Sequence, residues 1–144
     1  MSTMKHFIKA NKKVKPNTFY AASDNFVDED GKPLLWEIKP LSTKDNERIK
    51  DECTTIIETR DKGFRATPKI DIKLLQARQI VASVVFPDLF NAELQDSYGV
   101  KEPEELLFAM LDEAGDYQNL VMFVQKFNRL NVSLDEKIIE AKNS

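Results

Sequence analysis

The feature that most constrains this chain is the apolar segment Ile72–Phe86, which Pro87 interrupts. Five of its side chains recur at the three- and four-residue spacing of one helix face: Leu74, Ala77, Val81, Val84 and Val85. The polar side chains between them are expected to face water: Lys73, Gln76, Arg78 and Gln79. Proline lacks the N–H that a continuing helix needs and disfavours helical geometry at the residue before it. We therefore predict an amphipathic helix that ends at Phe86 and supplies the centre of the core.

A turn and a short second helix are predicted directly after this segment. Pro87 and Asp88 open the turn. Asn91 is suited to cap a helix over Ala92–Tyr98, and Gly99 is suited to end it in a left-handed conformation.

A β-hairpin is predicted near the N-terminus. Asp28–Gly31 is a turn signal, preceded by the β-prone pair Phe26-Val27 and followed by the alternating run Leu34–Lys39. Three side chains of that run share a face and are expected to point into the core: Leu34, Trp36 and Ile38. Two strands alone are marginal in water, so the hairpin has to pack on helices.

An amphipathic helix is predicted over Thr43–Thr59. Ser42 with Asp45 three residues later is typical of a helix start. The apolar face of this helix is formed by Ile49, Cys53, Ile56 and Ile57. Cys53 is therefore expected to be a small buried residue and not a reactive thiol. Arg60–Lys69 is expected to be a loop.

Further helices are predicted in the C-terminal part of the chain. Pro103 suits the first turn of a helix that Gly115 ends, and its inward face is Leu106, Leu107, Met110 and Leu111. The apolar stripe of the next helix is Tyr117, Leu120, Val121, Val124 and Phe127. Ser133 with Glu136 predicts a last helix over Leu134–Ala141.

Together these elements predict a mainly α fold of the α+β class, a compact multi-helix domain with one small N-terminal β-hairpin. One domain is expected from a length of 144 residues. It is expected to span residues 18–144, after a flexible basic arm at residues 1–17. The core is expected to bring together Trp36, Ile56, Val81, Val84 and Leu107.

The residues indicate no catalytic, cofactor or metal site. His6 is the only histidine, so a Ser-His-Asp triad and a histidine-based zinc cluster lack support. Asp28–Asp30 lacks the distal glutamate of a calcium loop, and a two-carboxylate hydrolase has no positive evidence. The longest apolar run, Ile80–Phe86, is far shorter than the roughly 20 residues of a membrane span. The N-terminus lacks the apolar block of a signal peptide, so a cytoplasmic protein is expected.

Four stretches of the chain resemble the XkdN-like family of phage tail assembly chaperones: FVDEDGKPLLWEIKPLSTKDNERIKDEC, VASVVFPDL, NAELQDSYGV and EELLFAML. The resemblance spans about Phe26 to the C-terminus and departs around Arg60–Lys69 and in the C-terminal helix. Members of this family are similar in binding the long helical tape measure protein and keeping it soluble until tail-tube subunits polymerise around it. The resemblance therefore implies a non-enzymatic chaperone in the bacterial host cytoplasm, with the tape measure protein and tail-tube protein as partners. It also implies that a frameshifted longer product can accompany a chain that ends at Ser144.

Apolar side chains outside the predicted core faces are the candidates for partner binding: Phe90, Phe108, Met122 and Phe123. Burial between neighbouring helices explains Met122 and Phe123 equally well. Self-association is a further possibility. A nucleic-acid-binding regulator is the alternative function, through a lysine cluster that contains no acid: Lys5, Lys9, Lys12, Lys13 and Lys15. The net charge of −3 provides no general attraction to nucleic acid.

The basic arm is predicted to be dispensable for folding, because it has no periodic apolar face and only Phe7 and Ile8 could anchor it. Deleting Met1–Lys15 should leave the melting temperature nearly unchanged in a thermal unfolding experiment. A large drop would show that these two side chains stabilise the folded domain.

Overall fold

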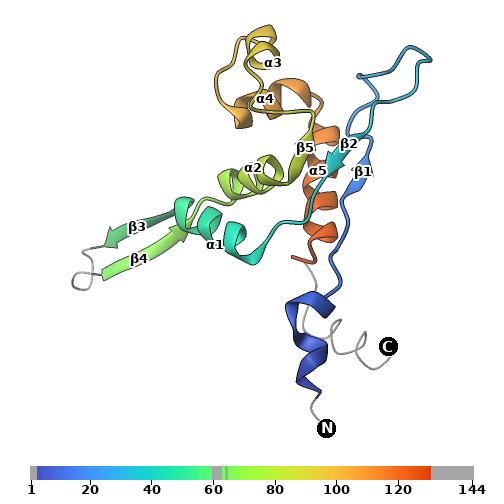
Figure 1. The fold of residues 1–144 in the computed structure, drawn as a ribbon. Coiled ribbons are helices and arrows are strands. Elements are labelled where there is room, and N and C mark those ends of the chain that lie inside the picture. Colours follow the sequence, from blue (N-terminus) through green and yellow to red (C-terminus); the bar gives the residue numbers. More distant parts are fainter. Residues whose placement is uncertain (1–2, 60–62, 64, 131–144) are drawn as a thin grey trace.

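The computed structural model describes residues 3–59, 63 and 65–130. Three short strands form an antiparallel sheet in the order β1 (Thr18–Tyr20), β2 (Trp36–Ile38), β5 (Val84–Phe86). A second sheet is a two-stranded hairpin of β3 (Thr54–Thr59) and β4 (Arg65–Ile70), which projects from the body of the molecule (Figure 1). The fold is α+β, as predicted, and it contains more strand than the one small hairpin expected.

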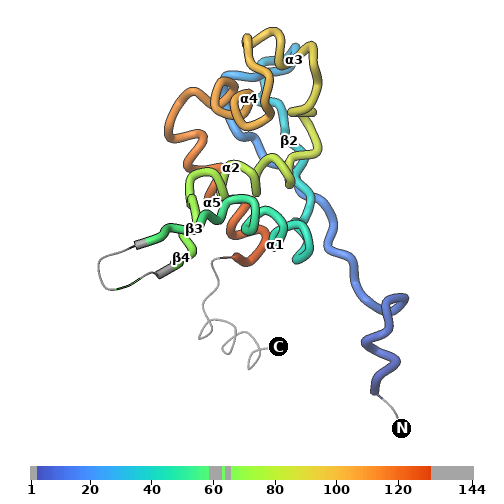
Figure 2. Tube along the Cα trace, turned by 90° about the vertical axis from the view of Figure 1, so that its left-hand side faces the viewer, coloured from blue at the N-terminus to red at the C-terminus, as the bar shows by residue number. Residues whose placement is uncertain are grey.

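Helix α2 (Ile72–Ser83) lies at the centre of the helical part of the fold. The other helices are α1 (Thr43–Glu52), α3 (Ala92–Ser97), α4 (Pro103–Met110) and α5 (Ala114–Phe127), preceded by the short 3-10 turns η1 (Met4–Phe7) and η2 (Lys9–Asn11). Helix α2 packs against α1, α4 and α5 and leads directly into β5. Figure 2 shows α1, α2 and α5 close together, with α3 and α4 toward one end.

The central apolar segment is part helix and part strand, so the prediction of a helix to Phe86 was wrong. Helix α2 ends at Ser83, and the next three residues pair with β2 in the register Ile38–Val84 and Glu37–Phe86. The backbone N–H of Lys39 also donates to the Ser83 carbonyl at 2.8 Å. Valine and phenylalanine favour strands, and here the edge of β2 offers them backbone partners. As a result, Val85 is exposed and does not share the buried helix face.

Gln79 is buried, although the helical pattern predicted that it would face water. Its Nε2 donates to Asn46 Oδ1 on α1 at 2.8 Å, and its Oε1 accepts from Gln125 Nε2 on α5 at 2.7 Å. A buried amide is tolerated when both its donor and its acceptor are paired. This chain of three amides links α1, α2 and α5.

The core contains most of the predicted residues. Trp36, Val81 and Leu107 are buried together, and Val84 packs against them while partly buried. Ile56 was wrongly predicted, since 69% of it is exposed. The predicted inward face of α4 is buried throughout: Leu106, Leu107, Met110 and Leu111.

The helix predicted over Thr43–Thr59 is only half a helix. The Ser42 hydroxyl accepts from the Asp45 N–H, which confirms the predicted cap, but α1 ends at Glu52. Residues 54–59 instead form β3, which pairs with residues that were expected to lie in a loop, in the register Thr54–Ile70 to Thr59–Arg65. Cys53, at the junction, is buried as predicted. Residues 60–62 and 64 of the predicted loop lie outside the described residues.

The predicted turn of the N-terminal hairpin is confirmed, but the predicted extent of its strands was wrong. The Gly31 N–H donates to the Asp28 carbonyl, Gly31 has a positive φ, and Val27 bridges Pro33. Beyond this bridge, however, the regular strand covers only Trp36–Ile38 and pairs with β1 and β5. Leu34 lies outside that strand and is exposed, so it does not share the buried face as predicted.

The remaining local predictions are mostly confirmed. The Asn91 side chain caps α3 by accepting from the Leu94 N–H, and Gly99 has a φ of 68°. Pro103 occupies the first turn of α4. Gly115 does not end that helix: α4 stops at Met110, and Gly115 lies in the first turn of α5. The last predicted helix, Leu134–Ala141, lies outside the described residues.

The core assignment predicts opposite outcomes for two charged substitutions. Val81→Asp places an unpaired carboxylate against the buried side chains of α4 and α5 and should prevent stable folding. Ile56→Asp is the matched control, because the side chain is exposed on β3 and its loss should change the free energy of unfolding by less than about 1 kcal/mol. Denaturant unfolding measures both variants. Equal stabilities would contradict the placement of α2 in the core.

Candidate partner-binding site

An apolar groove lies at the end of the molecule that contains α3. Its cavity volume is about 210 Å³, and its walls come from three segments, with Met110 of α4 added at its floor. The lining residues are Phe26, Leu34, Leu35, Trp36, Phe86, Pro87, Leu94, Tyr98 and Met110. The exposed surface inside it is almost wholly apolar. We call these nine residues the apolar groove.

Local structure explains how the three segments meet. The hairpin around residues 28–31 is closed by the Leu34 N–H, which donates to the Phe26 carbonyl at 2.7 Å. The second wall begins with Phe86 and Pro87 at the end of β5, where their peptide bond is cis. The third wall is α3, and the Gln95 side chain holds this helix near the turn by donating to the Leu89 carbonyl at 2.8 Å.

The groove combines a buried floor with exposed walls. Trp36 and Met110 are buried and belong to the core. By contrast, 54% of Leu35 and 59% of Phe86 are exposed. Large apolar side chains that gather around a hollow mark a site for another apolar group. Because the floor is part of the core, the shape of the groove does not depend on a ligand to form it.

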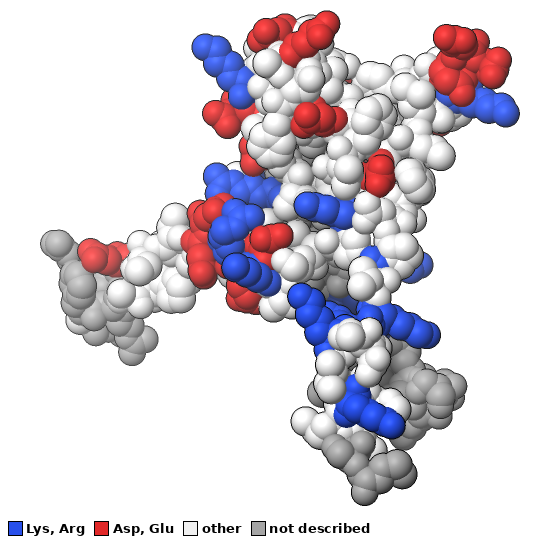
Figure 3. All heavy atoms as spheres, viewed as in Figure 1, with Lys and Arg blue, Asp and Glu red and all other residues white. Residues whose placement is uncertain are grey.

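Acidic residues flank the groove on two sides. In Figure 3 a largely uncharged surface lies between red atoms at α3 and red atoms at the hairpin turn. The turn carries Asp28, Glu29 and Asp30, and the α3 side carries Asp88, Glu93 and Asp96. Lys32 and Lys101 are the nearby bases in the sequence. A segment with apolar side chains between cationic ones would complement such a surface.

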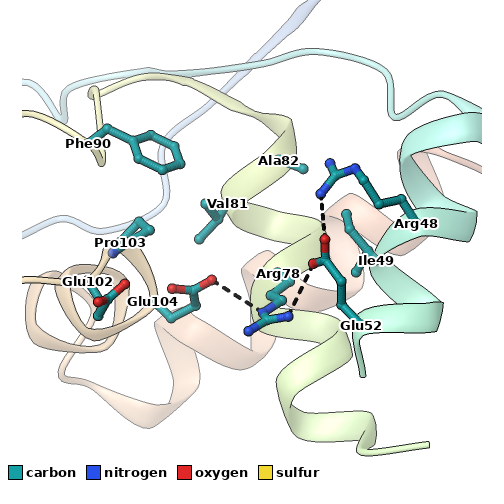
Figure 4. Close-up of a pocket in the computed structure, with 10 residues that line it drawn as sticks. All are labelled: Arg48, Ile49, Glu52, Arg78, Val81, Ala82, Phe90, Glu102, Pro103 and Glu104. Atoms are coloured by element: carbon teal, nitrogen blue, oxygen red, sulfur yellow. Dashed lines mark hydrogen bonds and ion pairs between the residues drawn. The ribbon is translucent and has the colours of Figure 1, made fainter. Parts of the chain in front are cut away.

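A second cavity, of about 490 Å³, lies between α1, α2 and α4 and is shown in Figure 4. Arg78 occupies its wall and pairs with Glu52 at 3.2 Å and with Glu104 at 3.7 Å. Arg48 also pairs with Glu52, at 3.0 Å. The charges of this cavity therefore join three helices to one another, which is a structural role.

The β3–β4 hairpin has one apolar face. Strand alternation and the observed register place Ile56, Ala66, Pro68 and Ile70 on the same side. All four are exposed. This face is a second surface on which a partner could pack, although the side chains form only a narrow stripe.

The four binding candidates predicted from sequence lie in different surroundings. Phe90 is exposed at the cavity of Arg78. Phe108 is exposed on α4, with its ring centroid 5.0 Å from that of Tyr117. Met122 is 61% exposed on α5. Phe123 is partly buried and stacks on Tyr20 at 4.2 Å and on Phe127 at 6.2 Å, so it packs against the core.

The apolar groove was not predicted from the sequence, because none of its segments carries a distinctive pattern on its own. Leu34 and Leu94 were assigned to a buried strand face and to a short helix, and Phe86 to a helix end. One signal was present in the sequence: Leu34-Leu35 follows a turn and Phe86 precedes a proline, and side chains at such chain reversals are hard to bury completely.

The titratable groups near the core behave as structural residues. Burial raises the pKa of the Cys53 thiol, which keeps it protonated and unreactive at neutral pH. Burial also raises the pKa of Tyr117, and burial together with Asp116 raises that of Tyr20. Within residues 3–59, 63 and 65–130, no group of three or more His, Cys, Asp and Glu residues is placed to hold a metal ion. No helix in the same part of the chain has the length and apolar content to cross a membrane.

Comparisons of the sequence and of the fold with known proteins point to the same group of proteins. Residues 4–142 match the family described as phage XkdN-like tail assembly chaperone protein, TAC. Protein XkdN of the phage-like element PBSX of Bacillus subtilis (strain 168) is 26% identical over 121 residues, which cover 84% of this chain and 80% of XkdN. The uncharacterized protein YqbN of the same strain is also 26% identical over 121 residues, with the same coverage of each chain. The crystal structure of YqbN has a similar fold, with a TM-score of 0.73 and 20% identity over 89% of this chain and 97% of that one.

Phe123 and Met122 are neighbours on α5, but their surroundings predict that only Phe123 contributes substantially to the stability of the fold. Phe123→Ser removes a ring stacked between Tyr20 and Phe127 and should lower the free energy of unfolding by about 2 kcal/mol. Met122→Ser, on the exposed side of the same helix, should lower it by less than about 0.5 kcal/mol. Urea denaturation provides both values, and equal losses would contradict the packing of Phe123 against β1.

Proposed function

Because the chain belongs to the family of phage XkdN-like tail assembly chaperones, we propose that it binds the tape measure protein and assists polymerisation of the tail tube around it. The observation that carries the proposal is the apolar groove, an open hollow with a buried floor and exposed walls. The proposed setting is the cytoplasm of the bacterial host, where tails would assemble. The nucleic-acid-binding alternative is not favoured, because family membership points to a protein partner.

The shape of the groove suits one turn of an amphipathic helix. Apolar side chains three or four residues apart project from the same face of a helix, and grooves bind helices through such anchors. A volume of about 210 Å³ has room for one or two such side chains. A long helical client would then be held at many points by separate chaperone molecules, each with a small contact.

A small contact also fits the requirement for release. A chaperone of this kind has to leave when tube subunits cover the same client, so the affinity of each groove must be modest. Interfaces below about 1,200 Å² are typical of transient encounters. In this proposal, tail-tube protein competes with the chaperone for the tape measure protein.

Two double variants distinguish the groove from the surface predicted on α4 and α5. Leu35→Gln with Phe86→Gln removes exposed groove walls and should weaken binding to co-expressed tape measure protein by about tenfold or more, since each buried side chain contributes about 1.5 kcal/mol or more. Phe108→Gln with Met122→Gln is the matched control, and it removes two similarly exposed side chains that do not line the groove. Co-purification followed by titration measures the loss, and circular dichroism verifies folding. If only the control variant loses the client, the binding surface is on α4 and α5.

A further inference from the structure

The basic arm displays apolar side chains that the described part of its own chain leaves exposed. Phe7, the last residue of the 3-10 turn η1, is 79% exposed, and Ile8, between η1 and η2, is 57% exposed. Residues 1–17 contain five lysines and one histidine and no acidic residue. The arm is therefore an apolar pair between cations, which is the chemistry that the apolar groove and its acidic flanks complement.

The arm leaves the domain at the end away from its own groove. The Lys15 ammonium lies 4.1 Å from the centre of the Phe127 ring and donates a hydrogen bond to the Phe127 carbonyl, at the last residue of α5. Figures 1 and 2 both place the arm at one end of the molecule and α3 at the other. While Lys15 holds this position, the arm lies at the end of the molecule opposite to the groove of its own chain.

We propose that Phe7 and Ile8 of one copy insert into the apolar groove of a second copy. The lysines of the arm then lie beside the acidic residues of the hairpin turn and of α3. Charge complementarity selects this occupant, because residues 1–17 contain cations and no acidic residue, whereas the apolar side of the β3–β4 hairpin also carries Glu58, opposite Ala66.

The contact is head-to-tail, since the arm and the groove are different surfaces at opposite ends of the chain. Such contacts do not pair two copies symmetrically: each copy keeps one free arm or one free groove for a further copy. Self-association covers the exposed walls of the groove when no client is present. A client that binds the same groove would displace the arm, and this consequence rests on the proposed function, whereas self-association itself does not.

The first test measures self-association of the full chain without any client. Sedimentation velocity over a range of protein concentrations should show a mass that rises with concentration and that falls when salt is raised from about 50 mM to about 500 mM, because the charges are exposed and screened. Phe7→Ser with Ile8→Ser should weaken the association by about tenfold or more. Ile56→Ser with Ile70→Ser, on the apolar face of the β3–β4 hairpin, is the matched control and should associate like the parent.

A mixing experiment then tests which surfaces meet. The arm variant Phe7→Ser with Ile8→Ser keeps an intact groove, and the groove variant Leu35→Gln with Phe86→Gln keeps an intact arm. At a protein concentration at which the parent just associates, each variant alone should be largely monomeric. An equimolar mixture should form a heterodimer that grows no further, because only one intact arm and one intact groove are present in each pair.

Three results would overturn the proposal: a parent chain that stays monomeric, an arm variant that associates like the parent, or a mixture that stays monomeric. Loss of association in the hairpin control with an unchanged arm variant would assign the contact to β3 and β4 instead. None of these measurements contains the tape measure protein, so a failure here is distinguishable from a failure of the proposed function.

Discussion

The burial of α2 on several sides is the constraint on which the rest of the structure depends. This helix contacts α1, α4 and α5, and its chain continues without a break into the strand that completes the sheet. A helix enclosed in this way cannot keep a wide polar face, so its one deeply buried amide must be fully paired. Gln79 meets this condition by donating to one neighbouring helix and accepting from another. The packing of three helices, α1, α2 and α5, is thereby tied to a single side chain.

The charged residues around α2 contribute less to this arrangement than their number suggests. The ion pairs of Arg48 and Arg78 join α1, α2 and α4, but 57% of the Arg48 side chain and 33% of the Arg78 side chain are exposed. Exposed pairs of this kind contribute at most about 1 kcal/mol each and weaken in salt. The helices are therefore held together mainly by apolar contacts and by the buried amides. The ion pairs contribute chiefly to how α1, α2 and α4 are oriented relative to one another.

Because the core is concentrated around α2, the two ends of the molecule are free to display apolar side chains. At one end the apolar groove rests on Trp36 and Met110, which belong to the core, so its shape is set by folding itself. At the other end the basic arm is attached near Phe127. The two surfaces on which we propose contacts with other molecules therefore lie at opposite ends of the molecule.

Elements whose signals are local were predictable from the amino-acid sequence. They are the caps at Ser42 and Asn91, the left-handed Gly99 and the stripes of α4 and α5, because each depends on neighbours within a few residues. The state of Val84–Phe86 and Thr54–Thr59 depends instead on pairing with distant parts of the chain. Short β-branched runs satisfy either a helical or a strand pattern, and the choice is made by whether another strand offers backbone partners. The groove was decided in the same way, since its walls come from segments up to about 70 residues apart, which only the packed chain brings together.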